Sequence, residues 1–124
     1  MINRLGDMPE GTIGFEFAGD VTGEEYRQVL EPPLEQAVEA GEVRLLLRTA
    51  EDFDGMKLGA RTEDAKANIR LGVAHRKAWK RVAIVTDSDW LSASFRVWSH
   101  FVPVEMKIFA AAEAADARTW VAAA

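Results

Sequence analysis

The sequence predicts an α/β fold in which a mixed, mostly parallel sheet of about five strands is covered by four or more helices, in the order ββαβαβαβα. Short apolar runs bounded by turn residues alternate along the chain with longer segments in which apolar residues recur at helical spacing. Strands separated by helices pair in parallel through right-handed crossovers, so most of the sheet is expected to be parallel. The chain has 124 residues and no long linker, so residues 1–124 are predicted to form a single domain.

Two strands are expected at the beginning of the chain. In the stretch TIGFEFAG, the apolar residues 13, 15 and 17 alternate with Gly14 and Glu16, which is the two-residue period of a half-buried strand. The preceding stretch INRL is expected to pair with it as a short edge strand.

A helix is expected after the turn GDVTG. Thr22 can cap its N-terminus, and Glu25 three residues later would complete a capping box. Pro32 and Pro33 lie inside the helical pattern and should kink or split the helix, because proline lacks the backbone N–H that a helix interior requires. Gly41 is expected to end it.

The rest of the chain alternates strand and helix. VRLLLRT and RVAIVTD are nearly continuous apolar runs and are predicted to be buried strands, with a helix from about Leu58 to Lys77 between them. SDWLSASFRVWSHF is predicted to be a helix that Ser88 or Asp89 caps, followed by a last strand at VEMKIF. The alanine-rich C-terminal segment is expected to form a helix anchored by Trp120.

Composition excludes several classes of function. The chain has no cysteine, which removes disulfides, thiolate nucleophiles and cysteine-ligated metals. A net charge of −5 argues against general nucleic-acid binding. The start of the chain lacks the apolar core of a signal peptide, and no run reaches the roughly 20 apolar residues of a membrane span. The protein is therefore expected to be cytoplasmic and not transmembrane.

An acidic loop follows the first buried strand, in the stretch AEDFDG. Glu51, Asp52 and Asp54 could hold a metal or serve phosphate-ester chemistry together with Asp87 and Asp89. The spacing does not match a calcium loop of the EF-hand type, so capping of the next helix is the preferred interpretation. No metal and no cofactor are expected.

No catalytic residue is predicted. The two histidines, His75 and His100, lie on different predicted helices. The sequence contains neither a nucleophile elbow nor a glycine-rich phosphate loop.

The predicted helix after Asp89 carries more apolar residues than packing on a sheet requires. Four of them form one stripe, and Trp90, Val97 and Phe101 form a second about a quarter turn away. The second stripe could line a pocket, contact a partner, or be covered by neighbouring helices.

A basic cluster lies in the stretch HRKAWKR, around Trp79. Such a cluster could contact an anionic group, with Arg76, Lys77, Lys80 and Arg81 as the candidate contacts. The alternative is that Trp79 anchors the end of a helix while the cations remain solvated.

Four stretches carry a family resemblance: DFDGMK, AHRKAWKRVAIVTDSDW, PVEMKIF and EAADARTW. With the order of elements, they make nearly the whole chain resemble the SpoIIAA-like proteins of the STAS fold, which is related to the Sec14 lipid-binding domains. In phosphorylated STAS antagonists, a Ser or Thr lies in the loop after the central strand. Here that loop keeps Asp54 and Gly55 but has no hydroxyl residue, since Thr49 lies upstream and Thr62 downstream. The resemblance therefore implies the fold without the phosphorylation switch.

The sequence thus favours a non-enzymatic module that recognises a small apolar or amphipathic ligand, lipid-like by analogy, or a protein partner. A phosphate-ester enzyme and a homodimer without a ligand are the alternatives. The expected binding residues are Asp52, Asp54, Gly55, Met56, Leu58, Trp90, Ser94, Val97 and Phe101.

Overall fold

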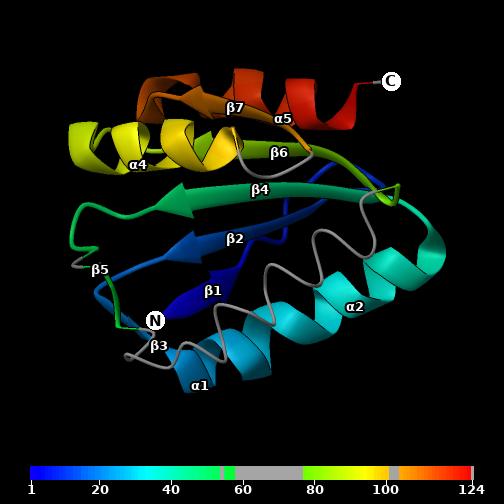
Figure 1. Cartoon of the computed structure of the whole chain (residues 1–124), viewed down its shortest axis with the longest axis horizontal. Coiled ribbons are helices and arrows are strands. Elements are labelled where there is room, and N and C mark those ends of the chain that lie inside the picture. The colour runs from blue at the N-terminus through cyan, green and yellow to red at the C-terminus, as the bar shows by residue number, and fades with distance from the viewer. Residues whose placement is uncertain (54, 58–76, 101–103, 124) are drawn as a thin grey trace.

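The computed structural model describes residues 1–53, 55–57, 77–100 and 104–123. Five strands form the main sheet in the order β1-β2-β4-β6-β7, with β1 antiparallel to β2 and the other pairs parallel (Figure 1). The strands of this sheet are β1 (Ile2–Arg4), β2 (Ile13–Phe17), β4 (Val43–Thr49), β6 (Trp79–Val85) and β7 (Glu105–Phe109). This arrangement confirms the predicted α/β class and the mixed, mostly parallel sheet.

Helical segments connect and flank these strands. The helix expected from Leu58 to Lys77 lies almost wholly outside the described residues. The described helical segments are α1 (Gly23–Glu25), the π-helix η1 (Tyr26–Leu30), α2 (Glu31–Ala40), α4 (Asp89–Ser99), the 3₁₀ turn η2 (Ala111–Glu113) and α5 (Ala114–Ala122).

A second, two-stranded sheet was not predicted. In it, β3 (Asp20–Thr22) pairs in parallel with β5 (Gly55–Lys57). Part of the expected turn GDVTG is therefore a strand, and the residues after the acidic loop enter a strand before any helix.

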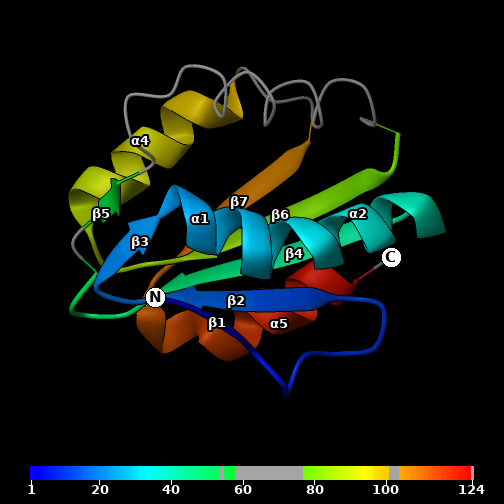
Figure 2. The same ribbon diagram turned by 90° about the horizontal axis from the view of Figure 1, so that it is seen from below.

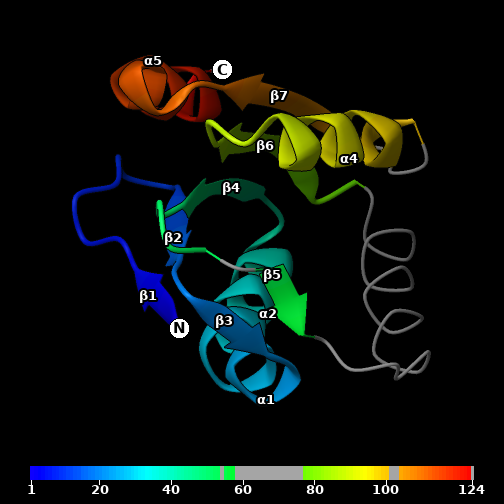
Figure 3. The same ribbon diagram turned by 90° about the vertical axis from the view of Figure 1, so that its left-hand side faces the viewer.

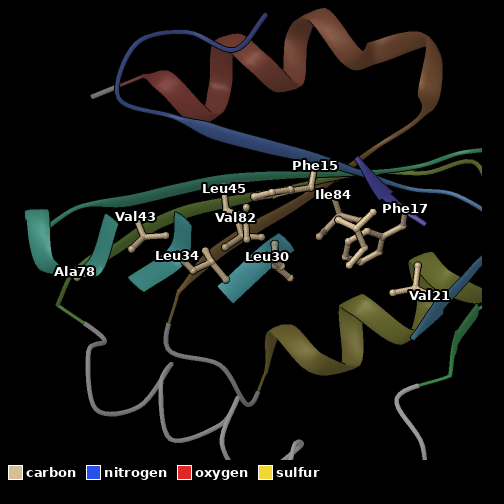
Figure 4. Packing of buried hydrophobic residues seen from close by; sticks show 11 residues of the cluster. Phe15, Phe17, Val21, Leu30, Leu34, Val43, Leu45, Ala78, Val82 and Ile84 are labelled. Carbon is tan, nitrogen blue, oxygen red and sulfur yellow. The ribbon is translucent and has the colours of Figure 1, made fainter. Parts of the chain in front are cut away.

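The two faces of the main sheet carry separate cores. On the face that we call the α2 face, α2 and α4 lie against the sheet (Figures 2 and 4). Its buried residues include Phe15, Phe17, Val43, Leu45, Val82 and Ile84 from the strands, with Leu30 and Leu34 from the helices. On the opposite α5 face, Ala117 and Val121 of α5 pack against Leu46, Ala83, Val85 and Phe109.

The first helical region is divided near Pro32 and Pro33, as predicted from these two residues. A π-helical turn precedes α2, and Pro32 and Pro33 occupy its first turn, where a missing N–H breaks no hydrogen bond. Gly41 ends α2 with φ +89°, a left-handed conformation that glycine adopts without strain.

The predicted capping box is only half formed. The side chain of Thr22 accepts a hydrogen bond from the backbone N–H of Glu25 at 3.2 Å, as expected. The Glu25 carboxylate accepts from the backbone N–H of Ile2 at 2.9 Å instead of returning to Thr22. Glu25 therefore joins α1 to the first strand.

Two arginines on the α5 face hold the C-terminal end of α5. Arg44 Nη1 donates to the carbonyl oxygen of Val121 at 2.9 Å, and Arg81 Nη1 donates to that of Trp120 at 2.8 Å. The Arg81 guanidinium also lies 4.9 Å from the centre of the Trp120 ring. Cations at this end of a helix satisfy free carbonyl groups and the negative end of the helix dipole.

Among the described residues, none of the helices combines the length and the apolar character that crossing a bilayer would require.

Candidate functional site

The candidate site lies where the parallel strands β2, β4, β6 and β7 end. Ligands of open α/β sheets bind outside the carboxyl ends of the strands, and we call this side of the sheet the carboxyl edge. Four segments meet there: residues 18–20, 50–53, 86–89 and 110–113. Backbone hydrogen bonds join two of these segments to the last residue of a neighbouring strand, from Ala50 N to Phe17 O at 2.8 Å and from Thr86 N to Phe109 O at 2.9 Å.

The acidic loop is a structured turn at this edge. Phe53 N donates to Ala50 O at 3.1 Å, and the ring of Phe53 packs 5.9 Å from that of Phe17. Asp52 Oδ1 accepts from the backbone N–H of Gly19 at 3.3 Å, where Gly19 has φ +54°. Asp52 thus links the loop after β4 to the loop after β2.

The segment after β6 uses its polar side chains in the same way. Asp87 Oδ1 accepts from the backbone N–H of Ala111 at 2.9 Å, which joins the loop after β6 to the turn before α5. Ser88 Oγ accepts from Leu91 N at 3.3 Å and so caps α4, as the sequence predicted. Asp89 lies exposed in the first turn of that helix, where a negative charge is favourable.

A pair of threonine hydroxyls connects β4 and β6. Thr49 Oγ1 and Thr86 Oγ1 lie 2.7 Å apart, and Ser88 N donates to Thr86 Oγ1 at 3.2 Å. Thr86 is only 3% exposed, so its hydrogen bonds replace those that water would supply.

The chemistry open to these groups is limited. Within residues 1–53, 55–57, 77–100 and 104–123, no three His, Asp or Glu side chains gather closely enough to hold a metal ion. Asp52 and Asp87 each accept a backbone N–H and belong to different loops.

The structure describes the predicted binding residues only in part. Val97 on α4 is described and is 58% exposed. Asp54, Leu58 and Phe101 lie outside the described residues. Gly55, Met56, Trp90 and Ser94 are placed along β5 and α4, but their side chains lie outside the described part of the structure.

The structure corrects the surroundings of Trp79, which was expected to anchor the end of a helix. Trp79 and Lys80 begin strand β6, two residues before the predicted strand start at Arg81, and Trp79 pairs with Val43. Arg81 pairs with Glu105 at 3.3 Å and donates to the Trp120 carbonyl oxygen of α5. Lys77 and Lys80 are exposed, and Arg76 lies outside the described residues.

An open cleft of about 680 Å³ lies at the opposite end of the sheet, where β2 and β4 begin. Sequence reasoning missed it, because its walls come from segments far apart in the chain. Arg44 in this cleft pairs with Glu42, and that hydrogen bond holds the pKa of the Glu42 carboxyl below its usual value. The lining residues are Arg4, Glu10, Gly11, Thr12, Ile13, Pro33, Gln36, Ala37, Ala40, Glu42, Arg44 and Ala122.

Comparison with known proteins agrees with this architecture. The model of the SpoIIAA-like family matches residues 12–122. A crystal structure of an uncharacterised protein with a SpoIIAA-like fold from Shewanella loihica PV-4 superposes with a TM-score of 0.70 at 28% sequence identity, covering 97% of this chain and 93% of that one. No curated protein matches. The chain therefore belongs to the SpoIIAA-like family.

Proposed function

We propose that this SpoIIAA-like domain is a non-enzymatic binding module whose carboxyl edge, together with α4, recognises a small apolar or amphipathic ligand or an apolar surface of a protein partner. The observation that carries the proposal is the contrast between these two parts of the site. Asp52 and Asp87 at the edge are occupied in joining loops, whereas Val97 on α4 is 58% exposed. Loops fixed by their own hydrogen bonds, together with an uncovered apolar side chain in the last turn of the helix that begins there, favour recognition over bond-making chemistry.

A phosphorylation switch is also disfavoured, because the hydroxyl groups of Thr49 and Ser88 are already engaged in hydrogen bonds. Thr49 is the described hydroxyl residue closest in sequence to the acidic loop, and its hydroxyl is bonded to the buried Thr86. Phosphate on Thr49 would break that bond and bring two negative charges against a buried group. Ser88 Oγ caps α4, so modification there would disturb a helix start.

The test measures binding of a long-chain fatty acid to wild type, Val97→Asp and the control Ala115→Asp. Ala115 is exposed on α5, on the other face of the sheet, so it receives the same charge away from the site. Covering the exposed part of a valine contributes about 1 kcal/mol, so Val97→Asp should weaken binding about fivefold or more. The control should bind as wild type does.

The fatty acid serves as a probe of an amphipathic ligand, and its analogy with Sec14 domains is one of fold alone. Native mass spectrometry of the protein purified from cells should show a bound small molecule or a bound partner chain. If neither is found and Val97→Asp binds the probe as wild type does, recognition at α4 is refuted.

The competing enzyme hypothesis is tested on the same protein. Metal-dependent hydrolysis of a phosphate ester that is lost in Asp87→Asn would establish chemistry at the carboxyl edge. We expect no such activity, because Asp87 is bonded to Ala111 N.

A further inference from the structure

Strand β7 forms one edge of the main sheet (Figure 3). Thr86 N donates to Phe109 O, so the backbone groups of Phe109 face β6. Successive residues of a strand direct their N–H and C=O groups to opposite sides. The backbone groups of Glu105 and Lys107 therefore also face β6, whereas those of Met106 and Ile108 point outward. No strand within the described residues pairs with this outer side.

We propose that a second copy of this chain pairs antiparallel with the outer side of β7, so that two sheets join about a two-fold axis. In the register centred on Met106, this residue lies opposite its own copy and the two exchange both of their N–H···O=C bonds. Val104 and Ile108 then lie opposite each other across the axis. Such an interface is closed, because each copy presents the same patch to the other.

The charged residues of β7 favour this register over the two registers shifted by two residues. The side chain of Glu105 is 61% exposed and that of Lys107 is exposed. With Met106 on the axis, Glu105 of each copy lies directly opposite Lys107 of the other, which gives two attractive cross-strand pairs. A shift by two residues in one direction places Lys107 opposite Lys107, and in the other direction Glu105 opposite Glu105. Both shifted registers are therefore opposed by like charges.

The apolar side chains of β7, which pack on the α2 face, support the same pairing. Val104, Met106 and Ile108 are half-buried and pack against the core of the α2 face, so a second β7 would extend this apolar row. A lysine on a free edge usually discourages pairing between sheets. Here Glu105 and Lys107 complement their own copies under a two-fold axis. A lysine that only blocked pairing would not need an acidic residue in this position.

The first test exchanges the charges and measures mass by sedimentation over a wide concentration range. Wild type should form a concentration-dependent dimer. E105K and K107E should each raise the dissociation constant about tenfold or more at low salt, because each turns two attractive pairs into two repulsive ones. The double variant E105K/K107E and an equimolar mixture of the two single variants should both recover the dimer.

Two controls separate these effects from loss of folding. E105K also breaks the pair with Arg81, so each variant is compared by circular dichroism with wild type. Glu39→Lys changes the same charge at an exposed position on α2 and should leave the dimer intact. A wild-type monomer at every concentration, or a dimer that responds equally to Glu39→Lys and E105K, overturns the proposal.

A backbone variant gives an independent readout. Met106→Pro removes an N–H that faces away from β6, so the pairing of β7 with β6 keeps its hydrogen bonds. The proposal requires this folded variant to be monomeric. A folded Met106→Pro dimer would overturn it, and if this variant fails to fold, the recovery of the dimer in the charge-swapped mixture still decides.

Discussion

Replacing Gly14 by alanine is expected to destabilise the domain by displacing the side chains of Met8 and Leu5 that pack over this position. A Cβ atom at position 14 would lie 2.7 Å from Met8 Sδ, 2.8 Å from Met8 Cγ and 3.1 Å from Leu5 Cδ1. Non-bonded carbon atoms prefer separations of about 3.5–4 Å. Met8 and Leu5 pack against the core of the α5 face, so moving them loses buried apolar contacts.

The expected size follows from two opposing contributions. Overpacking of a well-packed site costs about 1–3 kcal/mol, whereas alanine in a strand is better than glycine by about 0.5–1 kcal/mol. Gly14→Ala should therefore lower the free energy of unfolding by about 1 kcal/mol. In a Met8→Ala background the collision with the longer side chain is removed, and the same substitution should be neutral or stabilising by about 0.5 kcal/mol.

Urea unfolding followed by circular dichroism measures these differences in wild type, the two single variants and the double variant. Gly6→Ala is the matched control, since a Cβ there meets no atom within 4 Å. The reasoning is refuted if Gly14→Ala costs the same with and without Met8, or if it is as neutral as Gly6→Ala in wild type.

Two further predictions concern Tyr26 and Arg81. Burial, and then the charge of Glu31, raise the pKa of Tyr26 from 10.0 to about 12. The stability that this shift contributes should be complete below pH 10 and lost as the pH rises through about 12, and Tyr26→Phe should remove this alkaline loss in urea titrations. Arg81→Ala should lower the free energy of unfolding by about 1–3 kcal/mol, because it removes the hydrogen bond and ring contact to Trp120. Arg81→Lys should recover only part of this, which amide exchange in α5 would show.

The main sheet could be predicted because the pattern of apolar residues within each of its longer strands is enough to identify a strand. VRLLLRT has the continuous apolar character of a strand covered on both faces, and β4 has the predicted bounds, Val43–Thr49. Strands β3 and β5 have three residues each and mix glycine or charged residues with a single apolar one. Their pairing depends on contacts across the chain, which local periodicity does not contain.

The start of β6 shows where local pattern fails. The predicted helix ended near Lys77 and the predicted strand began at Arg81, whereas Trp79 and Lys80 already belong to β6. Pairing of Trp79 with Val43 decides in favour of a strand, and that contact is distant in sequence. Ser88 caps α4 as predicted, but Asp52, which was expected to cap the next helix, accepts from Gly19 N, and Asp87 accepts from Ala111 N. These partners are distant in sequence and could not be found from spacing.

The contacts at the carboxyl edge also determine how a bound molecule could act on the rest of the domain. Asp87 joins the loop after β6 to Ala111, which starts the turn before α5, while Arg44 and Arg81 hold the other end of that helix. A ligand that draws the Asp87 carboxylate away would remove the hydrogen bond that holds Ala111, at the start of η2, and would leave the bonds at the C-terminal end of α5 in place. The two ends of α5 are thus anchored by different parts of the sheet: the turn before it by the loop after β6, and its C-terminal end by arginines of β4 and β6.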